Sequence, residues 1–178
     1  MIINIYTDGA CSGNQNETNV GGWGTILEAG DNRKELYGGE ANTTNNKMEM
    51  TAVLEGLKSL KKHDVQVNVY SDSAYVVNCF NQRWYAKWQT NGWKTSQKSP
   101  VENRELWEQL IHYVHTIGTV NFYKVKGHLD LNKTSDVKKW YEKYAKAYGS
   151  VPMHEFEYLI KMNHRADELA NMGMEPYK

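Results

Sequence analysis

The chain has 178 residues, of which 40% are hydrophobic, and its 21 basic residues equal its 21 acidic residues in number. This size predicts one domain spanning residues 1–178, and zero net charge excludes a protein that binds polyanions with its whole surface. Two cysteines without metal-ligand spacing exclude a disulfide framework and a cysteine zinc site, and the absence of a leader or a long apolar run predicts a cytoplasmic protein without a membrane span.

Five segments have the hydrophobic pattern of β-strands and are separated by turn-rich joins such as Gly30-Asp31. These segments are 2–8, 22–28, 33–40, 65–71 and 119–126. Three of them precede the first predicted helix, which indicates an antiparallel meander. We therefore expect an α/β fold with a five-stranded mixed sheet flanked by helices.

Helical periodicity predicts helices at 44–61, 73–80 and 101–116. The first leads directly into the strand at 65–71, which indicates a strand-helix-strand crossover. The third is ended by Gly118, a residue typical of helix C-termini.

Four carboxylates lie in short, distinctive contexts: Asp8, Glu49, Asp72 and Asp167. Asp8 and Asp72 end the strand-like runs at 2–8 and 65–71, and the carboxyl ends of strands line the ligand crevice of open α/β sheets. Any one such aspartate is usually a turn former or helix cap. Clustered carboxylates repel one another unless a cation neutralises them, and Mg²⁺ prefers oxygen ligands. Together the four predict a divalent-metal site, and two ions about 3.5–4 Å apart suit phosphoryl displacement.

A local basic segment lies between residues 82 and 104, where five cations outnumber one acid. The cations are Arg83, Lys87, Lys94, Lys98 and Arg104. They are interleaved with aromatic residues, a mixture suited to a nucleic-acid backbone. Trp84 and Trp88, four residues apart, could equally anchor the segment to the core, so the cations are the stronger candidates for binding.

Seven short blocks occur in an order that resembles the type 1 ribonuclease H family, enzymes that cut the RNA strand of RNA·DNA hybrids. They are Tyr6-Thr7-Asp8-Gly9-Ala10-Cys11, Gly21-Gly22-Trp23-Gly24, Thr43-Thr44-Asn45-Asn46-Lys47-Met48-Glu49-Met50, Ser71-Asp72-Ser73-Ala74-Tyr75-Val76, Trp93-Lys94-Thr95, Val125-Lys126-Gly127-His128 and Asp167-Glu168-Leu169-Ala170. The resemblance covers nearly the whole chain and implies the ribonuclease H-like fold.

The resemblance also implies a reaction and its metal ligands. Asp8, Glu49, Asp72 and Asp167 would be the catalytic tetrad holding two Mg²⁺ ions, with Mn²⁺ able to substitute. Hydrolysis of internal RNA bonds would leave 5′-phosphate and 3′-hydroxyl ends. We expect a monomer that needs no obligate protein partner and no membrane.

Substrate contacts follow from the same resemblance. Four residues would approach sugar and phosphate: Asn14, Thr44, Asn45 and Asn46. Asn45 would read the RNA 2′-hydroxyl, the group that distinguishes RNA from DNA, while Thr44 or Asn45 would also cap the following helix. The stretch 84–98 resembles a basic protrusion that grips the DNA strand, with Trp84, Lys87, Trp88, Trp93, Lys94 and Lys98 as its binding residues.

His128 follows Gly127 in an expected loop, and an imidazole there can move a proton near neutral pH. The resemblance supports that catalytic role. The histidines at 63, 112, 115 and 154 are interpreted as surface or core residues. His164, three residues before Asp167, has no assigned role.

The main departure from the family pattern is a helical insertion at 129–162, before the last helix. Its first helix has an aromatic face, carrying Val137, Trp140, Tyr141, Tyr144 and Tyr148, and a lysine face, carrying Lys138, Lys139, Lys143 and Lys146. Amphipathic aromatic stripes are mostly buried, so we expect this helix to pack on the core, the alternative being a second nucleic-acid surface. A second helix is predicted to start at Val151-Pro152.

Two other functions are compatible with parts of the pattern. One is a recombination or transposition nuclease acting on DNA, which the Thr43-Thr44-Asn45-Asn46 block and the absence of an extra domain disfavour. The other is a hybrid-binding module without catalysis, which the presence of all four acids disfavours.

Overall fold

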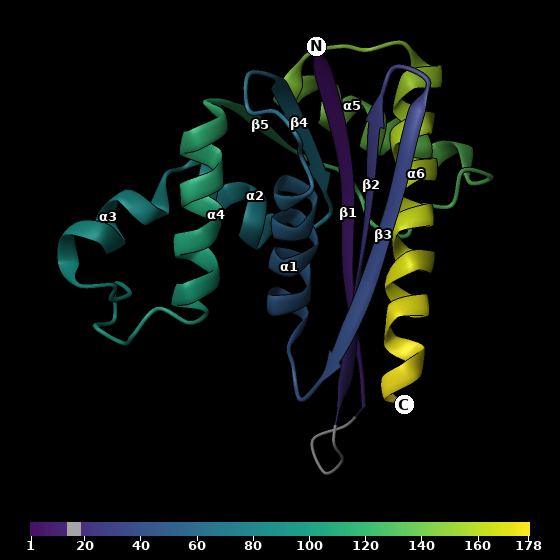
Figure 1. Cartoon of the computed structure of the whole chain (residues 1–178). Helices are drawn as coiled ribbons and strands as arrows, with labels where there is room; N and C mark the ends of the chain where they lie inside the picture. The colour runs from purple at the N-terminus through teal and green to yellow at the C-terminus, as the bar shows by residue number, and fades with distance from the viewer. Residues whose placement is uncertain (14–18) are drawn as a thin grey trace.

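The computed structural model describes residues 1–13 and 19–178. Five strands form one mixed sheet with the order β3-β2-β1-β4-β5 (Figure 1). The strands are β1 (Ile2–Ser12), β2 (Val20–Ala29), β3 (Asn32–Ala41), β4 (Gln66–Ser71) and β5 (Thr119–Lys124). The first three strands pair antiparallel, and β4 and β5 run parallel to β1. The predicted meander followed by a crossover is confirmed.

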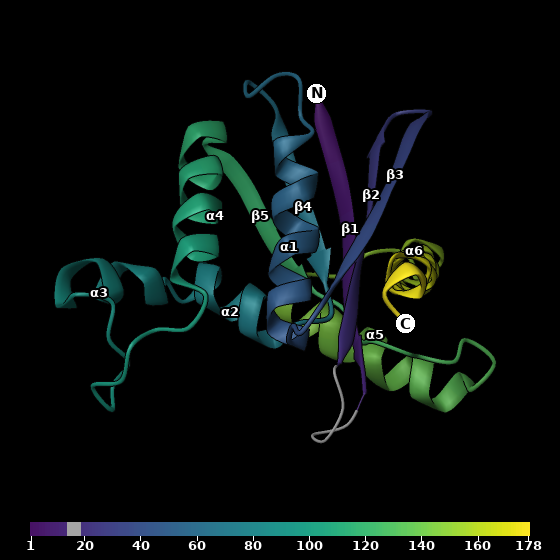
Figure 2. The same ribbon diagram turned by 60° about the horizontal axis from the view of Figure 1, so that its bottom comes forward.

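Six α-helices and a short 3-10 helix accompany the sheet in the described residues. They are α1 (Asn45–Lys58), α2 (Ala74–Asn81), α3 (Trp84–Asn91), α4 (Arg104–Ile117), α5 (Thr134–Tyr148), α6 (Met153–Met174) and the 3-10 turn Glu175–Tyr177. Helices α1 and α4 cover one face of the sheet, and α5 and α6 cover the other (Figures 1 and 2). No helix in residues 1–13 and 19–178 is long and apolar enough to cross a membrane.

Each face of the sheet has its own core because successive side chains of a strand point to opposite faces. On β1, Ile5 belongs to the cluster under α1, α2 and α4, whereas Tyr6 belongs to the cluster under α5 and α6. Tyr6 stacks on Tyr70 of β4, which stacks in turn on Tyr123 of β5. Helices α5 and α6 pack on this row of tyrosines.

Two strand boundaries differ from the prediction in ways that matter for the site. Strand β1 does not end at Asp8 but continues to Ser12, since Ala10 and Cys11 still pair with β2. Strand β5 ends at Lys124 rather than at residue 126. Asp8 is therefore the point at which β1 loses its parallel partner β4 and keeps only its antiparallel partner.

Helix α6 lies directly on glycines of the meander. A Cβ atom built on Gly22 would lie 1.9 Å from the carbonyl oxygen of Ala170, and one on Gly24 would lie 2.3 Å from that of Ala166. Only residues without side chains let a helix backbone approach a sheet this closely. Arg165 adds two hydrogen bonds of 2.9 Å to Glu35 on β3, and these fix the rotation of α6 about its axis.

The insertion packs on the core, as predicted. Val137 and Tyr144 of α5 are buried, and Trp140, Tyr141 and Tyr148 pack against the same cluster. Its second helix begins at Met153, next to the predicted start, and runs without a break to Met174. The end of the insertion and the final helix thus form one continuous helix, α6.

We expect Gly22→Ala to destabilise the protein by roughly 1–3 kcal/mol or more, because the added methyl group forces α6 away from β2. The free energy of unfolding from urea denaturation measures this. Gly30→Ala is the control for backbone strain alone, since Gly30 has φ +61° and nothing within 4 Å of its built Cβ, and should cost about 1–2 kcal/mol. Parent-like stability of Gly22→Ala would contradict the close packing.

Candidate active site

The register of two parallel strands brings Asp8 and Asp72 together. Thr7 of β1 pairs with Ser71 of β4, so the next residue on each strand is an aspartate. Beyond this point β4 turns into α2, whose first turn is capped by Ser73 accepting a hydrogen bond of 3.2 Å from the Val76 N–H. The two carboxylates therefore meet where the sheet splits between β1 and β4.

Glu49 reaches the same place from α1. The helix begins after Thr44, whose hydroxyl accepts a hydrogen bond of 3.1 Å from the Lys47 N–H, as expected of a cap. A Cβ on Gly9 would lie 2.5 Å from the backbone nitrogen of Glu49, so β1 passes against the first turns of α1. This contact aims the Glu49 carboxylate at Asp8.

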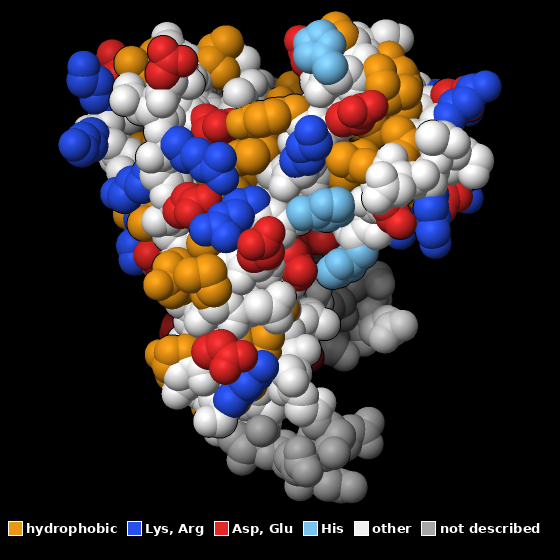
Figure 3. Space-filling model, turned by 90° about the vertical axis from the view of Figure 1, so that its right-hand side faces the viewer, with side chains coloured by type: hydrophobic (Ala, Val, Ile, Leu, Met, Phe, Trp, Pro, Cys, Tyr) orange, Lys and Arg blue, Asp and Glu red, His pale blue; other side chains and the backbone are white. Residues whose placement is uncertain are grey.

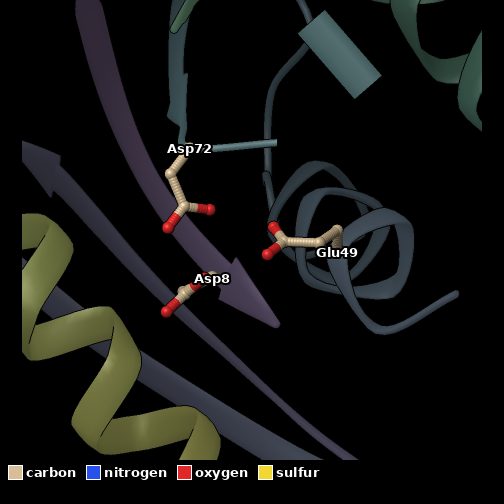
Figure 4. Close-up of side chains that lie close together, drawn as sticks. All are labelled: Asp8, Glu49 and Asp72. Atoms are coloured by element: carbon tan, nitrogen blue, oxygen red, sulfur yellow. The ribbon is translucent and has the colours of Figure 1, made fainter. Parts of the chain in front are cut away.

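The three carboxylates form one group (Figure 4). Asp8, Glu49 and Asp72 each offer an oxygen, and these oxygens lie within 4.8 Å of one another. Asp8 and Glu49 are buried, and the Oε2 atom of Glu49 has no hydrogen-bond partner. Burying an acceptor without a partner costs free energy, so the folded chain would gain stability from a ligand that binds this oxygen.

The electrostatics of the group favour its neutralisation. Burial raises the pKa of Asp8 well above its usual range, and the charges of Glu49 and Asp72 raise it further, with a contribution from Asp167. The pKa of Glu49 is also raised, first by burial and then by Asp72. A divalent cation would replace the protons, since hard ions take carboxylate oxygens as ligands. The residues present fit such an ion, although nothing in the donor set identifies which one.

An open hollow surrounds the group and contains other predicted residues. Asp167 and His128 line it, as do Asn45 and Asn46 at the start of α1. Asp167 is half-buried and is not one of the three acids within 4.8 Å of one another, so its role as a fourth ligand stays a prediction. On the side that carries α6, histidine and acidic side chains adjoin near the middle of the molecule, where the outline is notched (Figure 3).

The loop after β5 is held against Asp72. The Val125 N–H donates a hydrogen bond of 3.0 Å to the Ser71 carbonyl, and a Cβ on Gly127 would lie 2.4 Å from Asp72 Oδ2. His128 follows with a left-handed φ of 56°, a conformation that few non-glycine residues adopt. The exposed imidazole is thereby placed at the rim of the hollow.

The other predicted binding residues lie outside the hollow. Asn14 falls outside the described residues. The cations Lys87, Lys94 and Lys98 are exposed around α3. Trp93 is buried, and Trp84 and Trp88 are half-buried against the first core cluster. The rings thus anchor the segment, the alternative left open for Trp84 and Trp88, and Trp93 has little ring surface free for a base.

Two residues near the site were missed from the sequence. Asn171 lines the hollow and donates a hydrogen bond of 2.9 Å to the Asp167 carbonyl, and its i+4 spacing from Asp167 could have indicated a shared helix face. Lys124 pairs in register with Ser71. Because parallel neighbours end at one edge of a sheet, the end of the strand at 119–126 could have indicated a cation close to Asp72.

Without metal, Asp8→Asn should stabilise the protein at neutral pH. The folded state keeps the Asp8 proton above the ordinary carboxyl pKa of about 4, whereas the unfolded state releases it, so stability falls as pH rises from about 4 towards the raised pKa. We expect the Tm of Asp8→Asn in EDTA to exceed that of the parent by roughly 5 °C at pH 7.5 and by much less at pH 4.5. Exposed Asp64→Asn is the control, and a pH-independent difference would contradict the repulsion.

Comparison with known proteins agrees with this geometry. The family model described as RNase H matches residues 2–175. Ribonuclease H of Thermoanaerobacter sp. (strain X514) is 51% identical over 129 residues, which cover 72% of this chain and 80% of that protein. Ribonuclease H of Chlorobaculum parvum is 52% identical over 128 residues, which cover 72% of this chain and 84% of that protein.

Among solved structures, LC9-RNase H1 superposes with a TM-score of 0.61 at 27% identity, covering 87% of this chain and 80% of that one. LC9-RNase H1 is described as a type 1 RNase H with the type 2 active-site motif. The fold and the acidic hollow therefore have a common explanation in descent. The chain belongs to the ribonuclease H family of enzymes.

Proposed function

We propose that this protein hydrolyses internal phosphodiester bonds of RNA paired with DNA, leaving 5′-phosphate and 3′-hydroxyl ends. The observation that carries the proposal is the group of three carboxylates within 4.8 Å, with Asp167 and His128 lining the same hollow. The family supports the substrate. LC11-RNase H1, a structural neighbour at 21% identity and a TM-score of 0.59 that covers 98% of each chain, was solved in complex with an RNA/DNA hybrid.

Asp8, Glu49 and Asp72 would hold the metal ions, and Asp167 would complete the set from α6. We infer that the ions are two Mg²⁺, as the resemblance to type 1 ribonuclease H implies, and the open hollow beside the carboxylates has room for the waters and substrate oxygens that Mg²⁺ retains as ligands. When bound, such ions supply a hydroxide-like nucleophile and stabilise the leaving oxygen. The protein's contribution is to hold the carboxylates in position before substrate arrives.

His128 would transfer a proton at the rim of the hollow. Its exposed imidazole can exchange protons with water and with the departing 3′-oxygen. Gly127, pressed against Asp72, would keep the histidine close to the scissile phosphate. The position of the loop therefore matters as much as the chemistry of the imidazole, because a looser loop would let His128 move away from the hollow.

Asn45 and Asn46 would recognise the RNA strand from the start of α1. Both are exposed, and both line the hollow beside Glu49. An amide can donate to and accept from a 2′-hydroxyl. The exposed lysines around α3 would contact the DNA backbone, since a cation on a flexible stem needs no specific base.

Asp72→Asn should nearly abolish cleavage, by at least about 10³-fold, because it removes one charge from the metal-binding group. Initial rates on a labelled hybrid in Mg²⁺ measure this. Asp64→Asn is the control, because it removes an exposed charge that precedes β4, at the opposite end of the strand from Asp72 and outside the hollow. If Asp72→Asn keeps parent-like rates, the metal assignment is wrong, and if the parent itself shows no Mg²⁺-dependent cleavage, the proposed reaction is wrong.

His128→Ala should lower kcat by roughly 10²-fold or less and change hybrid affinity little, because a proton carrier assists turnover without holding metal. Single-turnover rates and anisotropy binding separate the two effects. His112→Ala, at an exposed position on α4, is the matched control. An unchanged kcat for His128→Ala would remove the proposed role, and a large loss of affinity would reassign His128 to binding.

A further inference from the structure

A cluster of lysines surrounds one tryptophan on the α5 side of the sheet. The ammonium groups of Lys126, Lys139 and Lys143 lie 4.9, 5.4 and 4.3 Å from the centroid of the Trp140 ring. Like charges gathered on one ring repel one another, and cation–π attraction of about 0.5–1 kcal/mol per exposed contact offsets this only in part. We call Lys126, Lys139 and Lys143 the α5 lysine cluster.

The cluster borders a hollow of about 160 Å³ between β5 and α5. Trp140, Tyr144 and Tyr148 form its apolar wall, and Lys124, Lys126 and Lys143 add three ammonium groups. In the part of the chain that the structure describes, neither Lys124 nor any lysine of the α5 lysine cluster has a carboxylate within 4.0 Å of its ammonium group. The charge of this hollow is therefore available to an anion from outside.

The hollow adjoins the carboxylate group along the chain and in space. Lys124 lies in register with Ser71, the residue before Asp72. Burial lowers the pKa of Lys124, Asp72 opposes that effect, and Lys126 and Lys143 reinforce it. Lys124 therefore connects the end of β4, which leads into Asp72, with the hollow that it lines together with Lys126 and Lys143. An anion bound at the cluster would thus lie beside the active site.

The distribution of charge over the whole chain indicates a polyanion. Residues 124–148 contain seven lysines and three acids, a net charge of +4. Residues 82–104 also have a net charge of +4, so the remainder of this neutral chain carries −8. The two basic segments lie apart, α3 beyond α4 and α5 behind the opposite face of the sheet (Figures 1 and 2). A long, uniformly charged ligand can contact both, whereas a small anion cannot.

We infer that the α5 lysine cluster is a second backbone-binding surface, which takes phosphates of the RNA·DNA hybrid on the side of the active site away from α3. The identity of the polyanion rests on the proposed function. Packing and binding do not compete in α5, because its aromatic side chains pack on the core while Lys139 and Lys143 are exposed. A second nucleic-acid surface is the alternative that the aromatic pattern of the insertion, taken alone, disfavoured.

The test compares two triple variants of equal charge. Lys126→Gln/Lys139→Gln/Lys143→Gln removes the cluster, and Lys34→Gln/Lys61→Gln/Lys62→Gln removes three exposed lysines outside both basic segments. Binding of a 20-base-pair hybrid is followed by fluorescence anisotropy in EDTA over a range of salt. We expect the cluster variant to bind at least about tenfold more weakly at low salt and to flatten the slope of log K against log salt by about two to three units, given close to one unit per phosphate. The control should keep the parent slope.

A cluster variant with the slope of the control would overturn the inference. Lys139→Gln/Lys143→Gln, confined to exposed positions on α5, guards against misfolding of the triple variant and should flatten the slope by about one to two units; a parent slope here also counts against the inference. Because binding is measured in EDTA, it does not depend on cleavage. If the parent cleaves hybrids but the cluster variant keeps the parent slope of log K against log salt, only the second surface is rejected. If the cluster variant has a flatter slope but the parent does not cleave hybrids, only the proposed reaction is rejected.

Discussion

Mutual repulsion among buried carboxylates is the constraint around which this protein is built. Asp8 and Glu49 are buried beside Asp72, and burial together with the charge of Asp72 raises the pKa of both buried carboxyl groups. Such a group is unfavourable for the isolated fold and favourable only when a cation shares its oxygens. The scaffold must therefore supply enough rigidity elsewhere to keep the three acids from moving apart.

That rigidity comes from close backbone approaches at glycine. Gly9 lets β1 pass the first turns of α1, which carry Glu49, and Gly127 lets the loop before His128 lie on Asp72. Gly22 and Gly24 let α6 lie on the sheet, which brings Asp167 to the hollow. In each case the glycine, having no side chain, contacts a residue of the site or the element that carries one. The same close packing therefore stabilises the fold and positions the site.

The insertion extends this plan without altering it. Helix α5 packs its aromatic face on the tyrosine row of β1, β4 and β5, and the hydroxyl of Tyr148 accepts a hydrogen bond of 2.9 Å from the Lys124 N–H. This contact fixes the end of β5 one strand away from Asp72. Helix α5 thus stabilises the end of β5 near the active site and places lysines beside it.

Much of this protein can be predicted from its sequence. Periodicities of two and 3.6 residues identify the strands and most helix limits, because burial on one face imposes those periods. Asp8 and Asp72 could be paired in advance, since both follow hydrophobic runs, and the family blocks connected them to Glu49 and Asp167. What the tertiary structure alone decided is which side chains face which. The register of β1 and β4 set the distance between the acids, core packing buried the ring of Trp93, and the packing of α5 against β5 brought Lys126 to the Trp140 ring. Each of these outcomes depends on a contact between separate segments of the chain, and local pattern carries no information about such distances.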